Sequence, residues 1–253
     1  MRKKILVYSK TEDLKKMAKK IDSNEITTKD LFKIKKLLKL FIETDHLIID
    51  DSFSGEILAL FFKVIKNKSY DLWLDEFRHY PIYQRVLHHI AMNSSKNIFT
   101  RSKQIRFYLN QLYKKPTFVI YPWVEEINYK KREIKYNIYI RSNKEIILPQ
   151  KWNRVKKIED ADISILEFEK NILKVSMPKI IFQSISLRIP TIIVYDNIKL
   201  VNKLFKAVHN IYPTREINFH ELEILMYKNY SFKVPKKYRF NYNLANLKKR
   251  IIK

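Results

Sequence analysis

Short, mostly apolar runs alternate with segments of helical periodicity along most of this chain, and this alternation restricts its possible folds more than any other feature. Runs such as 5–8 and 46–50 are typical of buried strands, whereas apolar residues in 30–42 recur at helical spacing. Neighbouring parallel strands need a long crossover connection, which a helix usually supplies. Repeated strand–helix–strand units therefore predict an α/β fold with parallel sheets.

The same patterns give approximate bounds for each element. The expected strands are 5–8, 46–50, 70–74, 97–100, 117–121, 136–140, 146–148, 162–166 and 191–195. The expected helices are 11–21, 30–42, 55–65, 81–92, 103–113, 179–187 and 197–208, followed by a short basic helix at the end of 233–253. Helix 55–65 is apolar on nearly every side, so we expect it to be central.

The chain of 253 residues is long enough for two lobes. Charged residues cluster in 123–135, which marks this stretch as the linker. The predicted domains are therefore 1–122 and 123–253, the second including the C-terminal basic helix. Because 141–160 lacks a full strand–helix unit, the second lobe is predicted to be reduced.

Glycine occurs once, at Gly55, and cysteine does not occur. The Walker and Rossmann fingerprints both need glycines where the backbone approaches a phosphate, and neither pattern is present. A phosphate site in this chain must therefore use side-chain cations and helix N-termini. The absence of cysteine excludes disulfides, thiolate metal sites and a cysteine nucleophile.

The net charge is +25, from 51 basic and 26 acidic residues, and it favours binding of phosphate-bearing partners. Nucleic acid, anionic lipid and nucleotide sugars all qualify. The sequence shows no helix-turn-helix, zinc-finger or RRM signature, so nucleic-acid binding is the less favoured alternative. No apolar run approaches the roughly 18–20 residues of a membrane-spanning helix. We expect a cytoplasmic protein, with a charge compatible with peripheral contact with an anionic membrane.

Three consecutive segments form a recognisable pattern. They are Ala161-Asp162 with the strand that follows, Met177-Pro178-Lys179 with the helix that follows, and Arg188-Ile189-Pro190 with the next strand. In order, spacing and element type they resemble the C-terminal half of GT-B glycosyltransferases of the family 4 type. Segments 45–76 and 95–124 resemble the N-terminal half of that family less specifically.

The resemblance implies two Rossmann-like lobes, with a nucleotide sugar bound mainly by the second. It implies metal-independent transfer of the sugar to a hydroxyl of a glycan, lipid-linked or protein acceptor, commonly with retention of configuration and without a further cofactor. It also implies that the C-terminal segment returns to pack on the first lobe. That segment interleaves aromatic and basic residues, which also suits a membrane surface or nucleic acid.

The resemblance also assigns donor-binding positions. Arg141 and Lys144, after the first strand of the second lobe, best match the cations that neutralise the donor diphosphate. In so basic a chain, an ordinary loop would often offer such a pair, and this is the competing interpretation. Glu167 and Glu169 lie in the loop that would touch the transferred sugar. Solvated loop acids are an equally good interpretation of both.

The helix that begins at Pro178 and Lys179 offers orphan N–H groups and a partial positive charge to an anion. One turn into this helix, the family has a glutamate that binds the ribose, and this chain has Gln183. The companion acidic position falls on Val175. These two replacements make a catalytically inactive GT-B scaffold an alternative to an active enzyme.

The general base should lie on the first lobe. Asp75 and Glu76 follow one predicted strand and match the family's base best, and Asp51 follows another. A carboxylate within hydrogen-bond reach of the acceptor hydroxyl suffices for this role. Capping of the next helix is the competing interpretation of both acidic pairs.

Overall fold

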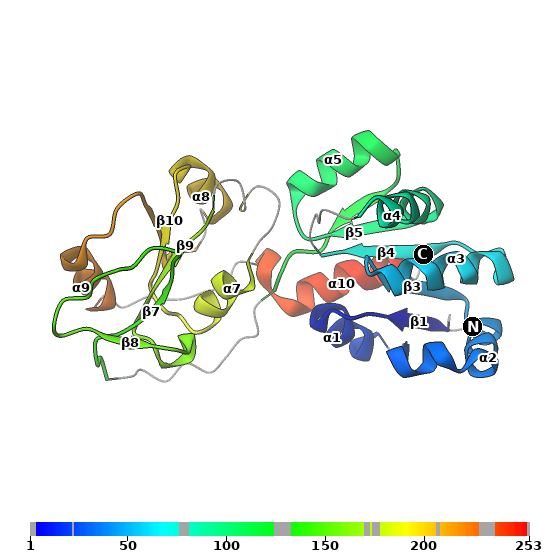
Figure 1. The fold of residues 1–253 in the computed structure, drawn as a ribbon, viewed down its shortest axis with the longest axis horizontal. Helices are drawn as coiled ribbons and strands as arrows, with labels where there is room; N and C mark the ends of the chain where they lie inside the picture. Colours follow the sequence, from blue (N-terminus) through cyan, green and yellow to red (C-terminus); the bar gives the residue numbers. More distant parts are fainter. Residues whose placement is uncertain are drawn as a thin grey trace. The chain divides into compact units, whose positions relative to one another are not determined.

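The computed structural model describes residues 4–21, 23–75, 81–123, 133–169, 173, 178–205, 208–227 and 236–251. The chain divides into two compact units (Figure 1). The first unit comprises Met1–Tyr121 and Asn243–Lys253, and the second comprises Pro122–Tyr242. Most of the expected linker 123–135, together with Glu76 and Val175, lies outside the described residues.

The first unit contains a six-stranded sheet in the order β2-β1-β3-β4-β5-β6, and all its strand pairs are parallel. The strands are β1 (Ile5–Tyr8), β2 (Asn24–Ile26), β3 (His46–Asp50), β4 (Tyr70–Leu74), β5 (Asn97–Thr100) and β6 (Thr117–Val119). The helices are α1 (Glu12–Lys20), α2 (Ile34–Glu43), α3 (Phe53–Lys66), α4 (Ile82–Ser94), α5 (Lys103–Tyr113) and α10 (Phe240–Ile251).

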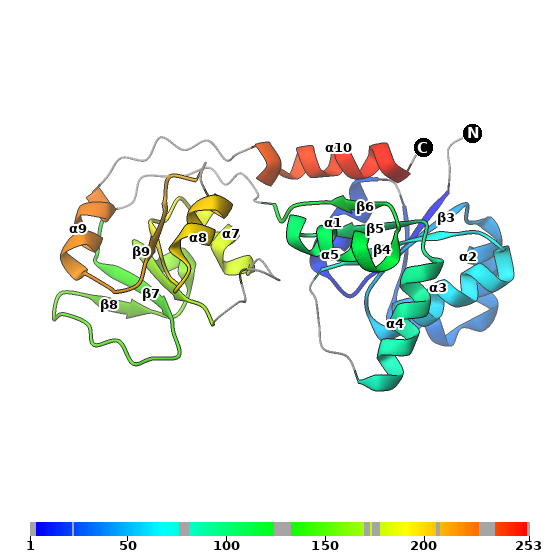
Figure 2. The ribbon, with the colours of Figure 1, turned by 90° about the horizontal axis from the view of Figure 1, so that it is seen from above.

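Helices α2 to α5 cover one face of this sheet, where their apolar side chains form a shared core with those of the strands. Helix α1 connects β1 to β2, in the opposite direction across the sheet from α3, α4 and α5. Right-handed crossovers therefore place α1 on the other face. In Figure 2, α10 runs along one face of the sheet, while α2, α3 and α4 lie on the other.

The C-terminal helix corrects the predicted domain 123–253. Residues Asn243–Lys253 belong to the first unit, with Asn243, Leu247 and Ile251 buried. The Arg250 guanidinium lies 4.3 Å from the ring centroid of Phe118 on β6. Burial of these side chains places the helix with the first unit, although the helix follows the second unit directly in sequence.

The second unit contains a five-stranded, fully parallel sheet in the order β11-β10-β9-β7-β8. The strands are β7 (Asn137–Arg141), β8 (Asn153–Val155), β9 (Ile163–Glu167), β10 (Thr191–Val194) and β11 (Ile211–Thr214). The helices are α7 (Lys179–Ser186), α8 (Ile198–Phe205) and α9 (Phe219–Tyr227). The predicted fold class, two Rossmann-like lobes of GT-B type with parallel sheets, is confirmed.

The connection from β7 to β8 explains why the second lobe is reduced. Residues 142–152 contain no helix, although β7 and β8 pair in parallel. Trp152 lies at the end of this connection. Its ring packs edge-on against Tyr136, with the centroids 5.5 Å apart, and at a tilt against Phe219, with the centroids 5.9 Å apart. The predicted strand 146–148 does not form, and β8 lies further along the chain.

Four elements were not expected from the sequence, namely β2, β8, β11 and α9. The three strands are three or four residues long, which is too short for a clear alternation. The expected helix 30–42 begins instead as a 3₁₀ turn, Thr28–Phe32. The carboxylate of Asp30 accepts hydrogen bonds from the backbone N–H and the hydroxyl of Thr27, and this capping box fixes the turn.

In each sheet the strand order reverses between two neighbours, β1 and β3 in the first unit and β7 and β9 in the second. The connections that follow these two strands run in opposite directions across the sheet, so the switch point lies between the carboxyl ends of the two strands. Open α/β sheets bind ligands at such switch points.

Among the helices of the described residues, none has the length and apolar character that crossing a membrane requires.

Gly55, the single glycine of the chain, lies in the first turn of α3. Ser52 caps this helix by accepting a hydrogen bond from the Gly55 N–H at 3.2 Å. A Cβ at position 55 would lie 2.7 Å from the backbone oxygen of Asp50 and 3.0 Å from its Oδ1. Glycine is therefore needed here for a close approach between the helix start and the end of β3.

We expect Gly55→Ala to lower the free energy of unfolding by about 1–3 kcal/mol, because the added methyl must displace backbone. In an ordinary helix position the same change raises stability by roughly 1 kcal/mol. Urea unfolding followed by circular dichroism measures the difference. A variant as stable as the parent would contradict the close approach.

Candidate functional site

The carboxyl ends of β7 and β9 form the switch point of the second unit and gather four of the predicted donor-binding residues. Arg141 ends β7, and Lys144 follows in the loop after it. Glu167 ends β9, and Glu169 follows. Arg141 pairs in register with Leu166, directly before Glu167. Parallel pairing thus brings together side chains that are 26 residues apart in the sequence.

Glu167 is the centre of this cluster. The Lys144 Nζ lies 2.8 Å from Glu167 Oε1, and the Ser142 hydroxyl donates a hydrogen bond to Oε2. Ser142 also accepts a hydrogen bond from the Lys144 N–H at 2.9 Å, which folds the loop back on itself. The loop after β7 is therefore attached to the end of β9 by one carboxylate.

These contacts shift the protonation equilibria of both partners. The ammonium of Lys144 and the hydroxyl of Ser142 lower the pKa of Glu167 below its usual value. Glu167, with a smaller contribution from Asp196, raises the pKa of Lys144. Asp196 follows β10, so the ends of three neighbouring strands contribute charge to this edge. At neutral pH the pair is fully ionised.

Arg141 and Glu169 surround this pair with exposed polar groups. Both side chains are exposed, and Asn143 Nδ2 lies 3.5 Å from Glu169 Oε1, a long contact. Arg141 has no ion pair with any of the described residues. A guanidinium exposed at a switch point can bind an incoming anion in a bidentate manner.

Helix α7 contributes its N-terminus and, beyond it, Gln183. Pro178 occupies the N-cap, where its side chain makes no capping hydrogen bond, and Lys179 is the first helical residue. Gln183 lies on the exposed side of a helix that is otherwise mostly buried. No hydrogen bond within the described part of the chain joins Gln183 to Glu167 or Lys144.

At the switch point of the first unit, Asp50 holds the loops together. Its carboxylate accepts hydrogen bonds from the Lys10 N–H, from the Ser9 hydroxyl at 3.2 Å and from the Ser52 hydroxyl at 2.6 Å. These contacts join the loop after β1 to the loop after β3. Asp51, one of the predicted bases, is buried with only 5% of its surface exposed.

Asp75, the other described base candidate, belongs to an ion cluster. Arg101, after β5, is buried between Asp75 and Asp13, with its Nε 3.5 Å from Asp75 Oδ1 and its Nη2 2.5 Å from Asp13 Oδ2. The indole N–H of Trp73 donates to Asp75 at 3.1 Å. Burial lowers the pKa of the Arg101 guanidinium, and the two carboxylates oppose that shift.

The two predicted groups of site residues therefore differ in their surroundings. Arg141, Lys144, Glu167 and Glu169 meet at one edge, partly exposed. Asp51 and Asp75 are packed among other side chains, and Glu76 lies outside the described residues. Sequence reasoning overlooked Ser142, although its position directly after a strand beside Arg141 was a usable signal. No sequence pattern could have revealed Arg101, because its partners are distant in the chain.

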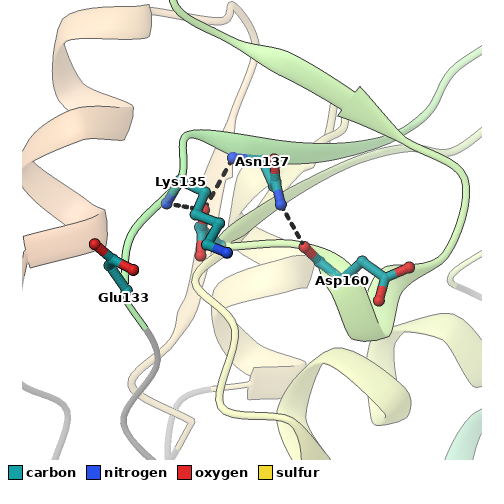
Figure 3. A pocket seen from close by; sticks show the side chains of 5 residues that line it. Glu133, Lys135, Asn137 and Asp160 are labelled. Atoms are coloured by element: carbon teal, nitrogen blue, oxygen red, sulfur yellow. Dashed lines mark hydrogen bonds between the residues drawn. The ribbon is translucent and has the colours of Figure 1, made fainter.

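A cavity of about 370 Å³ lies at the opposite, amino edge of the second sheet (Figure 3). It is lined by Glu133, Lys135, Asn137, Asp160 and Asp162. The Asp162 carboxylate accepts hydrogen bonds from the N–H groups of Lys135 and Asn137, each at 2.9 Å. The Asp162 carboxylate is already hydrogen-bonded to the backbone at the start of β7, so we place the candidate site at the carboxyl edge.

Across the described ranges, no three His, Cys, Asp or Glu side chains are grouped to hold a metal ion.

No protein-family model matches the chain, and no curated protein matches it in sequence. Its structure is similar to that of UDP-GlcNAc 2-epimerase from Methanocaldococcus jannaschii, with a TM-score of 0.55 and 8% sequence identity over 98% of this chain and 99% of the other. CalG4, the calicheamicin glycosyltransferase, matches more loosely, with a TM-score of 0.38 and 6% identity over 90% and 91% of the two chains. The first likeness shows a shared fold, while the second is too loose to carry an argument. Neither places the chain in family 4.

Glu167→Gln should lower the melting temperature at neutral pH, because the neutral amide loses the ion pair with Lys144. The folded-state pKa of Glu167 is depressed, so its stabilising effect is present above the unfolded-state pKa of about 4.3 and is lost as the pH falls through the lower folded-state value. Thermal unfolding of parent and variant between neutral and acidic pH tests this. Glu169→Gln, at an exposed residue with one long contact, is the matched control. A parent–variant gap that persists in strong acid would contradict the assignment.

Asp75→Asn should lower the free energy of unfolding by about 1–3 kcal/mol, since buried Arg101 loses one of its two carboxylates. Glu43→Gln, which changes an exposed acid at the end of α2, should have little effect. Denaturant unfolding compares the two. Equal stability of the two variants would show that Asp75 is free of a structural role and available as a base.

Proposed function

We propose that this protein transfers a sugar from a nucleotide-sugar donor to a hydroxyl acceptor, with the donor diphosphate bound at the β7–β9 edge. The observation that supports this most is the cluster at the switch point of the second sheet. Exposed Arg141, the Lys144–Glu167 ion pair and the Ser142 hydroxyl meet there. Two cations and a hydroxyl beside an open sheet edge suit a diphosphate in a chain that lacks a glycine loop.

In the proposed reaction the bond between the anomeric carbon and the diphosphate oxygen breaks, and a bond from the acceptor oxygen to that carbon forms. Charge develops on the departing diphosphate. Arg141 can bind it in a bidentate manner, while Lys144 adds a second positive charge. Glu167 holds the Lys144 ammonium in place before the donor arrives. The proposal invokes no metal, because Arg141 supplies positive charge to the leaving group and the Lys144 ammonium adds to it when it moves from Glu167 toward the diphosphate.

The remaining donor contacts follow from neighbouring elements. The start of α7 at Pro178 and Lys179 would add N–H donors and a partial positive charge. Gln183 would hydrogen-bond the ribose hydroxyls in place of the family's glutamate. Glu169 is exposed beside the edge and would accept hydrogen bonds from the transferred sugar.

The acceptor proton must go to a base on the first unit. Asp75, Glu76 and Asp51 remain the candidates that we propose. Asp75 is paired with Arg101, which stabilises its ionised form and makes it a weaker proton acceptor. The unfolding experiment on Asp75→Asn shows whether Asp75 stabilises the fold through Arg101 or is available as a base. We further propose a glycan, lipid-linked or protein hydroxyl as acceptor, and retention of configuration as in the family resembled.

The fold likeness supports the class of ligand. The matched UDP-GlcNAc 2-epimerase is named for a nucleotide-sugar substrate, and the likeness extends over nearly all of both chains. At 8% identity it does not distinguish transfer from another nucleotide-sugar reaction. Product analysis makes that distinction, since epimerisation needs no acceptor and leaves the sugar attached to the nucleotide.

A thermal-shift screen with UDP, GDP, ADP and CMP tests the proposal, because a ligand that binds the folded state raises the melting temperature. We expect a nucleoside diphosphate to do so, and Arg141→Met to weaken its binding about tenfold to a hundredfold through loss of charge-assisted hydrogen bonds. Arg154→Met, which removes an exposed arginine on β8 of the same sheet, is the matched control.

Three outcomes separate the alternatives. If no nucleotide shifts the melting temperature, the proposed function is wrong. Nucleotide binding without turnover of any donor would favour an inactive scaffold. Salt-sensitive binding of DNA without saturable nucleotide binding would favour the nucleic-acid alternative.

A further inference from the structure

Helices α3 and α4 of the first unit expose an unusual amount of apolar surface. Val64 and Ile82 have 82% and 79% of their surface exposed, although both are aliphatic. The exposed apolar residues of these two helices are Phe53, Ile57, Phe61, Val64, Ile82, Tyr83, Val86 and Ile90. A contiguous exposed patch of this kind on a folded unit marks an interaction surface. We name these eight residues the α3–α4 face.

The two helices form one continuous surface. They lie side by side on the same face of the first sheet. The rings of Phe53 and Tyr83 contact each other edge-on, with their centroids 6.2 Å apart, and this contact joins the two apolar stripes. Deeper between the helices, Glu56 pairs with His88.

The exposed charge on helices α3 and α4 has one sign. The single acidic residue of α3 and α4 is Glu56, and it is fully buried. Lys63 and Arg85 are exposed on these helices, and neighbouring α2 exposes Lys35 and Lys39 together with one acid, Glu43. The face therefore combines apolar side chains with cations and exposes no carboxylate on either helix.

We infer that the α3–α4 face docks the protein on an anionic lipid bilayer. Aliphatic and aromatic side chains enter the boundary between headgroups and acyl chains, while lysine and arginine remain with the anionic headgroups. A second copy of this chain would bring like charges together, and a nucleic acid would leave the aliphatic groups unused. This inference is independent of the proposed function, although it would bring a lipid-linked acceptor close to the enzyme.

Vesicle co-sedimentation tests the inference directly. The protein should bind phosphatidylcholine vesicles that contain phosphatidylserine. It should bind pure phosphatidylcholine vesicles much more weakly, and high salt should weaken its binding to the anionic vesicles. Ile82→Gln/Val86→Gln should weaken binding to the anionic vesicles about tenfold, because two side chains lose their apolar burial. Glutamine keeps a good helix propensity at both exposed positions.

The control is Ile147→Gln/Ile224→Gln, which changes two exposed isoleucines of the second unit and should bind like the parent. Thermal unfolding confirms that both variants fold, and nucleotide thermal shifts report separately on the proposed function. The inference is overturned if the parent does not bind anionic vesicles, or if the two double variants bind equally. It is also overturned if the parent self-associates in sedimentation equilibrium and Ile82→Gln/Val86→Gln disrupts only that association.

Discussion

Parallel pairing of β7 with β9 is the constraint on which the candidate site depends. Both strands end at the same edge, so the loop after β7 meets the last residue of β9. Glu167 is thereby brought within 2.8 Å of Lys144 and within hydrogen-bond reach of Ser142. The strand order reverses at this place, and open α/β sheets bind ligands at such switch points. A polar and partly exposed site follows from topology and three side chains, without a glycine loop.

The two units use the same topology differently. In the first unit the switch point is closed by Asp50, whose carboxylate joins two loops, and Gly55 permits the close approach of α3. Buried Arg101 occupies the edge further along, between Asp13 and Asp75. Polar groups at this edge mainly stabilise the fold. At the edge of the second sheet, by contrast, Arg141 is exposed and able to meet a ligand.

Strand and helix periodicity was sufficient to predict the fold class and most elements, because apolar patterns follow burial closely. The sequence placed Glu167 and Lys144 at the ends of two strands but assigned them to different parts of the donor, so their ion pair was not predicted. Most of helix α10 belongs to the first unit, as the resemblance implied, although the predicted domain bounds included it in the second. Two further features escaped prediction. Arg101 finds partners far away in sequence, and α3 is apolar all round yet has an exposed outer face. Periodicity reports how apolar a helix is, and it does not report what covers the helix.

The central claim is that a nucleoside diphosphate binds at the β7–β9 edge. A crystal structure of the protein with bound UDP tests it most directly. We predict phosphate oxygens within hydrogen-bond distance of the Arg141 guanidinium and close to the Lys144 ammonium. A diphosphate bound at the amino edge of the sheet, beside Glu133 and Asp160, or at the first unit, would contradict the account.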